Sequence, residues 1–145
     1  MRANRVTQSM EAATLSRTVT IARGIVRLAL VVQLVLGSLF WAGNATSLVD
    51  LHQFIGIVLV LSLETLVFAA ARAGVDRPLV ILAGLWGVIV VVLGLSQQNI
   101  LVGSAHWVIQ VLHLLVGLAA VGLSEALAGR IQRQSAAAHS EPRLS

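Results

Sequence analysis

Four long apolar segments follow one another along this sequence, at residues 20–42, 49–71, 78–97 and 105–129. A helix needs roughly 20 apolar residues to cross a hydrocarbon layer about 30 Å thick, because it rises about 1.5 Å per residue. Each segment has about this length, and the whole chain is 57% hydrophobic and only 11% charged. The pattern predicts four transmembrane helices and excludes a soluble globular domain.

The connections between these segments are short, so neighbouring helices must run antiparallel. The predicted fold class is all-α: a polytopic membrane protein in which residues 20–130 form one antiparallel bundle of four transmembrane helices. Residues 1–19 and 131–145 are expected to be mobile tails. A signal peptide is the rival interpretation of residues 1–45, but the apolar segment begins late and ends in "FWAGNA" without a clear cleavage site. We therefore expect a retained helix.

All ten basic residues are arginines, and they alternate between connections in a way that indicates orientation. Five precede or open the first span, two separate spans two and three, and three follow span four, whereas "GNATSLVD" and "SQQNILVGS" carry none. Basic residues favour the cytoplasmic side, so both termini and both tails are predicted to be cytoplasmic, in a bacterial inner membrane. The arginines form no polar face with interleaved aromatics, so the expected partner is the lipid bilayer and not nucleic acid.

The second and fourth spans carry a repeated motif. "LHQFIG" at residues 51–56 and "LHLLVG" at residues 112–117 each place a histidine four positions before a glycine. In both cases a glutamate follows the histidine by twelve positions, at Glu64 and at Glu125. The shared spacing indicates a duplication.

The first and third spans also share a short motif, "VLG", at residues 35–37 and 92–94. The bundle is therefore predicted to consist of two duplicated helical hairpins related by a pseudo-two-fold axis. Such an axis brings His52 and His113 to equivalent places on helices two and four, where they face each other across the bundle.

The two histidines are expected at similar depth. His52 lies twenty residues from Arg72, about 30 Å, and His113 lies seventeen residues from Arg130, about 25 Å. Two neutral imidazoles at one height can bind the iron of a b-type haem from opposite faces, and bundle cores are natural sites for such a cofactor. The hypothesis is one haem b per chain, with His52 and His113 as its metal ligands.

Small residues are expected where a porphyrin approaches helix backbone. The candidates for this part of the cofactor site are Gly37, Gly56, Gly94 and Gly117. Glycines also let membrane helices approach one another closely, which is the structural alternative.

His106 is a further candidate for the cofactor site. It precedes His113 by seven residues and so shares its helix face, about 10 Å nearer the outer side. It could replace His113 as a ligand, bind a haem propionate, or lie with Trp107 as an ordinary interfacial pair.

Two other readings of the histidines stay open. They could hydrogen-bond across helices as structural contacts, or His52 could form a divalent-metal site with Asp50 and His106. The chain has no cysteine, which excludes thiolate ligands.

The two glutamates of the repeat are expected to differ. Glu64 is expected to be protonated or bonded to a neighbouring helix, with a proton-carrying role as one option. Glu125 is expected to extend toward the cytoplasmic boundary.

One four-helix half of the haem A synthase family resembles this chain in four segments, "QLVLGSLFW", "DLHQFIG", "VVVLGLSQ" and "VLHLLVG". The chain resembles small four-helix membrane proteins with the same His-x-x-x-Gly layout just as closely. The resemblance covers residues 20–130 and implies haem binding at His52 and His113. A full synthase has two such halves, whereas this chain has one, and Val49 stands where the family has a glutamate. The resemblance therefore implies that this chain could hydroxylate a haem methyl group only as a homodimer, in which two copies would supply the two halves of a synthase.

The expected function is electron transfer with a membrane quinone or an outer-side redox protein, because one haem near the outer side cannot carry electrons across the membrane. No catalytic residue is predicted. The alternatives are a haem A synthase-like enzyme acting as a dimer and a non-haem scaffold subunit. No arginine is available on the outer side for haem propionates. They would have to be bound by Gln97, Gln98, Asn99, His106, Trp107 or backbone amides, unless the haem is inverted or another porphyrin is bound.

Overall fold

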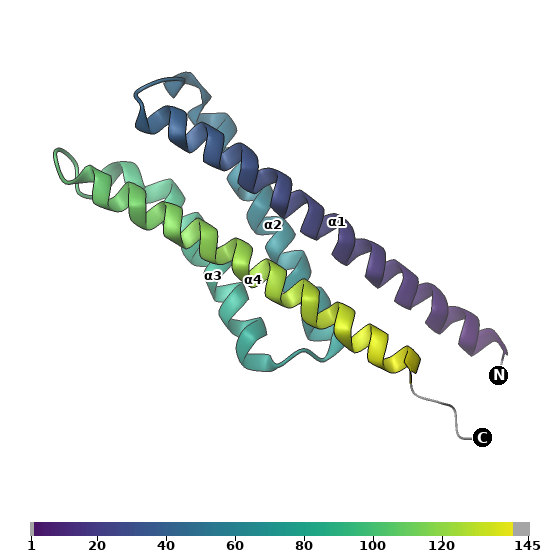
Figure 1. Cartoon of the computed structure of the whole chain (residues 1–145). Coiled ribbons are helices and arrows are strands. Elements are labelled where there is room, and N and C mark those ends of the chain that lie inside the picture. The colour runs from purple at the N-terminus through teal and green to yellow at the C-terminus, as the bar shows by residue number, and fades with distance from the viewer. Residues whose placement is uncertain (1, 141–145) are drawn as a thin grey trace.

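Four α-helices make up nearly all of the described part of the chain (Figure 1). The computed structural model describes residues 2–140, and within them the side chains of residue 7 and residues 10–137. Each α-helix contains a stretch long and apolar enough to cross a membrane, which confirms the predicted all-α fold class and makes the chain a multi-pass membrane protein. The elements are α1 (Arg2–Trp41), η1 (Thr46–Leu48), α2 (Val49–Ala73), α3 (Arg77–Ser96), η2 (Gln97–Asn99) and α4 (His106–Ser140), where η marks a 3₁₀ turn.

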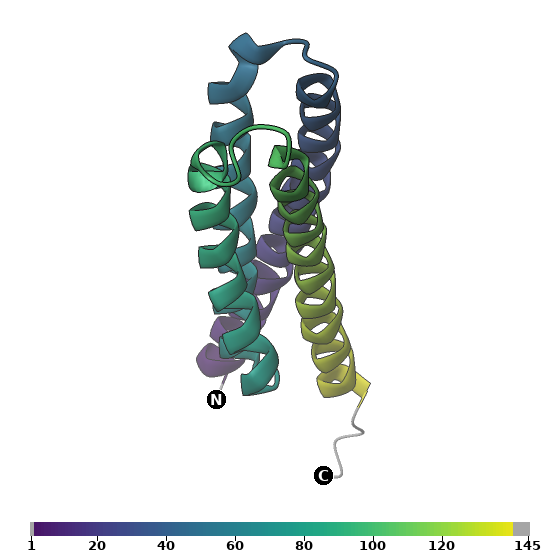
Figure 2. The same ribbon diagram turned by 90° about the vertical axis from the view of Figure 1, so that its left-hand side faces the viewer.

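The helices run alternately up and down. The start of α1, the end of α4 and the α2–α3 turn lie at one end of the bundle, and the α1–α2 and α3–α4 connections lie at the other (Figure 2). We call these the terminal end and the loop end. Residues 1 and 141–145 of the predicted tails lie outside the described residues. α1 and α4 continue as helix beyond the predicted boundaries of the transmembrane domain, and Val19 and Ile131, 1% and 2% exposed, belong to the packed core.

The turn between α2 and α3 shows how local sequence sets the helix ends. α2 stops at Gly74, whose φ of 79° lies in the left-handed region that glycine adopts without a Cβ clash. Pro78 then occupies the first turn of α3, where its missing N–H is not needed. Asp76 in this turn forms an ion pair with Arg130 of α4. The turn is thereby attached to the last helix.

α2 and α4 form the central pair of the bundle. α2 packs against α1, α3 and α4, and α4 packs against all three other helices, whereas contact between α1 and α3 is slight or absent. α2 and α4 therefore approach across the diagonal of the bundle. The two helices that carry the repeated histidine motif are in direct contact.

The tightly packed core lies toward the terminal end. Leu63, Leu66 and Leu127 are 0% exposed and pack there with small residues such as Ala70 and Ala128. Large apolar side chains also cover the outside of the helices, which suits a lipid-facing surface. Examples are Ile21, Leu28, Phe54, Leu61, Phe68, Ile81, Leu85 and Leu115.

Candidate functional site

The loop-end half of the bundle contains a partly open cavity of about 550 Å³. All four helices contribute to its walls. The lining includes every residue that the sequence predicted for a cofactor site: His52, His106, His113, Gly37, Gly56, Gly94 and Gly117. The structure thus gathers residues from positions 37 to 117 around one space.

His52 of α2 and His113 of α4 are neighbours across this cavity. Their ring centroids are 6.2 Å apart, and the ring planes are inclined by 50°. The Nδ1 atom of each ring is buried and has no hydrogen-bond partner among the described residues. A buried polar atom without a partner is unfavourable, so each imidazole is available to a ligand that enters the cavity.

Gln33 of α1 is a further residue of the site that the sequence analysis did not identify. Its amide Nε2 donates a hydrogen bond to the main-chain oxygen of His52 at 3.0 Å, and its Oε1 is buried without a partner. Phe40, also on α1, presents its ring to that of His52 in an edge arrangement with centroids 5.3 Å apart. A single amide in an otherwise apolar span was the available signal for Gln33.

Two of the four glycines give room to side chains of the site. A Cβ at Gly94 of α3 would stand 3.3 Å from Cε1 of His113, and a Cβ at Gly56 of α2 would stand 2.9 Å from Nε2 of Gln33. A Cβ at Gly37 or at Gly117 would meet nothing within 4 Å. Gly94 and Gly56 therefore permit close helix contact, while Gly37 and Gly117 border open space.

His106 lines the cavity from the first turn of α4, at the loop end. Its Nδ1 lies 3.2 Å from the main-chain oxygen of Ile100, so the α3–α4 connection already supplies a partner for this ring. His113, with its unpartnered Nδ1 beside His52, is the better placed of the two as a second ligand.

The divalent-metal site considered for Asp50, His52 and His106 is wrong. No group of three or more histidine, cysteine, aspartate or glutamate side chains within the described part of the chain could hold a metal ion. Asp50 precedes His52 by two residues, which turns it about 200° around the helix axis, and its side chain is exposed. It cannot point toward the same ion as His52.

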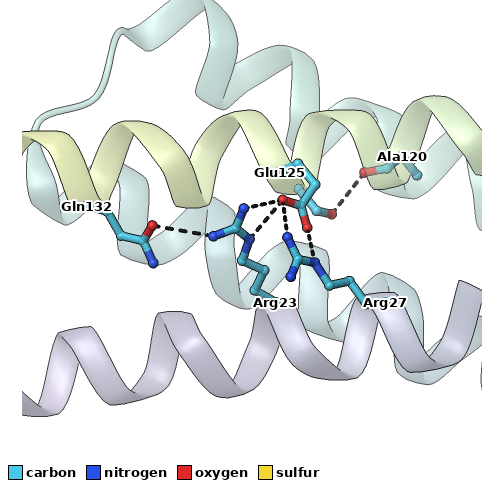
Figure 3. Close-up of polar contacts among 6 residues, drawn as sticks. Arg23, Arg27, Ala120, Glu125 and Gln132 are labelled. Atoms are coloured by element: carbon cyan, nitrogen blue, oxygen red, sulfur yellow. Dashed lines mark hydrogen bonds and ion pairs between the residues drawn. The ribbon is translucent and has the colours of Figure 1, made fainter.

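A second polar cluster lies outside the cavity, toward the terminal end, between α1 and α4 (Figure 3). Glu125 accepts hydrogen bonds from both Arg23 and Arg27, with Nε distances of 2.8 Å and 2.7 Å. Arg23 also reaches Gln132 at 3.4 Å. The sequence analysis expected Glu125 to extend toward the cytoplasmic boundary, and the structure joins it to the first helix through two ion pairs.

Comparison with known proteins gives no relative that carries this arrangement. No family model, curated protein or solved structure matches the chain. The cavity and its residues must therefore indicate the function by themselves, and the resemblance to haem A synthase stays a prediction.

Proposed function

We propose that this protein is an integral membrane b-type haem-binding protein, in which His52 and His113 bind the iron of one haem per chain. The observation that carries the proposal is the separation of the two imidazoles. An imidazole nitrogen binds a transition metal at about 2.0–2.1 Å and the ring centre lies about 1.1 Å beyond, so two rings on opposite sides of one metal have centres about 6.2–6.4 Å apart. The centroid separation of 6.2 Å agrees with this arrangement.

The hydrogen-bonding state of the rings supports the same proposal. A histidine that binds a metal uses one nitrogen and usually donates its other N–H to a carbonyl or carboxylate. Oε1 of Gln33 is an acceptor without a partner, on a side chain already bonded to the main chain of His52. We expect Gln33 to orient the His52 ring when the cofactor is bound.

The cavity suits a flat apolar molecule with polar groups at one edge. Its volume of about 550 Å³ falls within the range of small-molecule and cofactor sites. Most of the lining is apolar, and no arginine contributes to it. The amides of Gln53, Gln97 and Gln98 are among the polar groups of the lining that could bind haem carboxylates.

A bound haem would supply one-electron redox chemistry. His52 and His113 would hold the iron, and the mostly apolar walls of the cavity would limit the access of water to it. The site lies toward the loop end alone, so electrons would be exchanged at that side, with a membrane quinone or a redox protein as partner. From the arginine distribution we assign the terminal end to the cytoplasm of a bacterial cell and the loop end to the outer side of its inner membrane.

Optical spectroscopy of the full chain, purified in detergent after expression with ample haem, tests the proposal. The expected result is a Soret band, a sharp alpha band on reduction and one haem per chain by pyridine haemochrome analysis. His52→Ala and His113→Ala are expected to lose the sharp alpha band, and His106→Ala serves as the matched control that keeps it. If His106→Ala loses the band while His113→Ala retains it, the second ligand is His106.

Other outcomes would support the rival functions. The protein would be a scaffold subunit without haem if it stays colourless after haemin is added and if neither histidine substitution changes its thermal stability. Conversion of haem O to a hydroxylated product by a dimeric preparation would identify a haem A synthase-like enzyme.

A further inference from the structure

Glu64 is the one intramembrane carboxyl group among the described side chains that the proposed haem site and the ion pairs leave unused. It lies on α2 between Leu63 and Leu66, both 0% exposed, twelve residues from His52. Its Oε1 atom is buried, and no described residue gives it a hydrogen bond. Glu64 as a whole is half-buried, so a carboxylate in this position would have no counter-charge and, at Oε1, no hydrogen-bond partner among the described residues, which disfavours the charged form.

The carboxyl group lies against glycine backbone on α3. A Cβ at Gly87 would collide with Oε1 of Glu64, and a Cβ at Gly84 would lie 3.7 Å from Oε2. The two glycines are one helical turn apart, so they form a shallow recess that receives the head of the side chain. Val60 and Val67, one turn to either side of Glu64 on α2, border the same recess.

The duplication explains why this glutamate has no partner. The repeated "VLG" motifs relate α1 to α3 by 57 positions (92 − 35), so Arg27 corresponds to Gly84. The histidine motifs relate α2 to α4 by 61 positions (113 − 52), so Glu64 corresponds to Glu125. Glu125 contacts Arg27, and Glu64 contacts the recess at Gly84. In both halves the glutamate thus contacts the corresponding position of the neighbouring helix, but only the Glu125 half has an arginine at that position.

The charged groups of the surrounding helices do not replace the missing arginine. On α3 the only charged residue is Arg77, seven positions or about 10 Å along the axis from Gly84. Arg72 of α2 is eight positions or about 12 Å from Glu64 and lies over the ring of Phe68. Arg23, Arg27 and Glu125 form the ion pairs between α1 and α4, and Asp76 pairs with Arg130 near the terminal end.

We propose that Glu64 is a proton-binding site within the membrane: a neutral carboxylic acid, held between α2 and the Gly84–Gly87 recess of α3, whose proton exchanges with water. The ligand is a proton and not a metal ion, because one carboxyl group flanked by valine and glycine offers too few oxygen ligands for a cation. Glu64, Gly84 and Gly87 do not line the imidazole cavity, which the recess meets only at Val60, and the proposed proton site does not depend on haem.

Infrared difference spectroscopy of the full chain in liposomes tests this assignment. Protein labelled with carbon-13 at glutamate carboxyl groups is expected to show the carbonyl stretch of a protonated acid at neutral pH, and the band is expected to shift in D₂O. Glu64→Gln removes the band, whereas Glu125→Gln, which changes the other intramembrane glutamate, retains it. A spectrum with carboxylate bands alone, or a protonated band that D₂O does not move, would overturn the proposal.

Restoring the missing cation gives a second, independent test. A Cβ at Gly84 makes only ordinary contacts, at 3.6 Å and 3.7 Å, so the backbone accepts a side chain there. Gly84→Arg is expected to convert Glu64 to a carboxylate and abolish the band, while the matched Gly84→Ala keeps it. Persistence of the band in a folded Gly84→Arg protein would contradict the inference. Repeating the measurement on haem-free His52→Ala protein, where the band should remain, separates this result from the proposed haem function.

Discussion

Gly94 on α3 lies directly beside the His113 ring, so replacing Gly94 with alanine tests how tightly this ring packs against α3. The new Cβ would stand 3.3 Å from Cε1 of His113, whereas carbon atoms ordinarily approach to about 3.5–4.0 Å. The ring must therefore move by about 0.2–0.7 Å. Metal sites tolerate about 0.2 Å in ligand distance. To keep the displaced ring within bonding distance of the metal, the His113 side chain must adopt a strained torsion, which costs about 0.5–1.5 kcal/mol. This cost corresponds to about two- to tenfold weaker haem binding.

The measurement is a haem titration of haem-free protein in detergent, followed by Soret absorbance. Gly117→Ala is the matched control, because Gly117 lines the same cavity and its Cβ would meet nothing within 4 Å. Both changes favour helix by up to about 1 kcal/mol, so stability alone would make them behave alike. We expect weaker binding only for Gly94→Ala. Equal affinities for wild type and both variants, or an equal loss in Gly117→Ala, would refute the assignment of His113 as a closely packed ligand.

Three further predictions concern the bundle and can be checked by thermal unfolding in detergent. Leu63→Ala should destabilise the protein by about 2–5 kcal/mol because Leu63 is 0% exposed, while Leu61→Ala, at a position 61% exposed, should change little; equal effects would contradict the described packing. Trp86→Phe removes the hydrogen bond from Nε1 to the main-chain oxygen of Val116 at 2.9 Å and should cost about 0.5–1.5 kcal/mol; an unchanged midpoint would show that this bond does not contribute. Glu125→Gln should lower the unfolding temperature because it weakens both ion pairs between α1 and α4; a midpoint equal to wild type would show that the arginines find other partners.

The transmembrane helices could be predicted because the membrane imposes a simple requirement. A chain in hydrocarbon must satisfy its own backbone hydrogen bonds, so length and hydropathy suffice to place a spanning helix. Residues 49–71 were predicted and α2 covers Val49–Ala73, and residues 78–97 were predicted and α3 covers Arg77–Ser96. α1 and α4 continue as helix beyond the predicted spans at residues 20–42 and 105–129, because a helix outside the hydrocarbon layer needs no apolar run.

The proximity of His52 and His113 was also predictable, since the repeat fixed their equivalent places. The contacts of single polar residues were not, because they depend on which helices touch. Gln33 reaches His52 only through the packing of α1 on α2, and Arg23 reaches Glu125 only through the packing of α1 on α4. Hydropathy and spacing contain no information about those pairings.

The two halves of the bundle have diverged at some duplicated positions and not at others, and the pattern is informative. Under the proposed function, a metal between two imidazoles would need an equivalent ligand from each half, and histidine stands at both position 52 and position 113. A paired carboxylate needs only its own arginine, so Glu125 keeps Arg27 while Glu64 faces glycine. The two halves are therefore alike at the histidines near the loop end, where the proposed ligand would be shared, and differ at the two glutamates toward the terminal end, where the proposed roles are separate. On this argument, a change at either histidine should disable the cavity as a whole, whereas a change at either glutamate should affect one half alone.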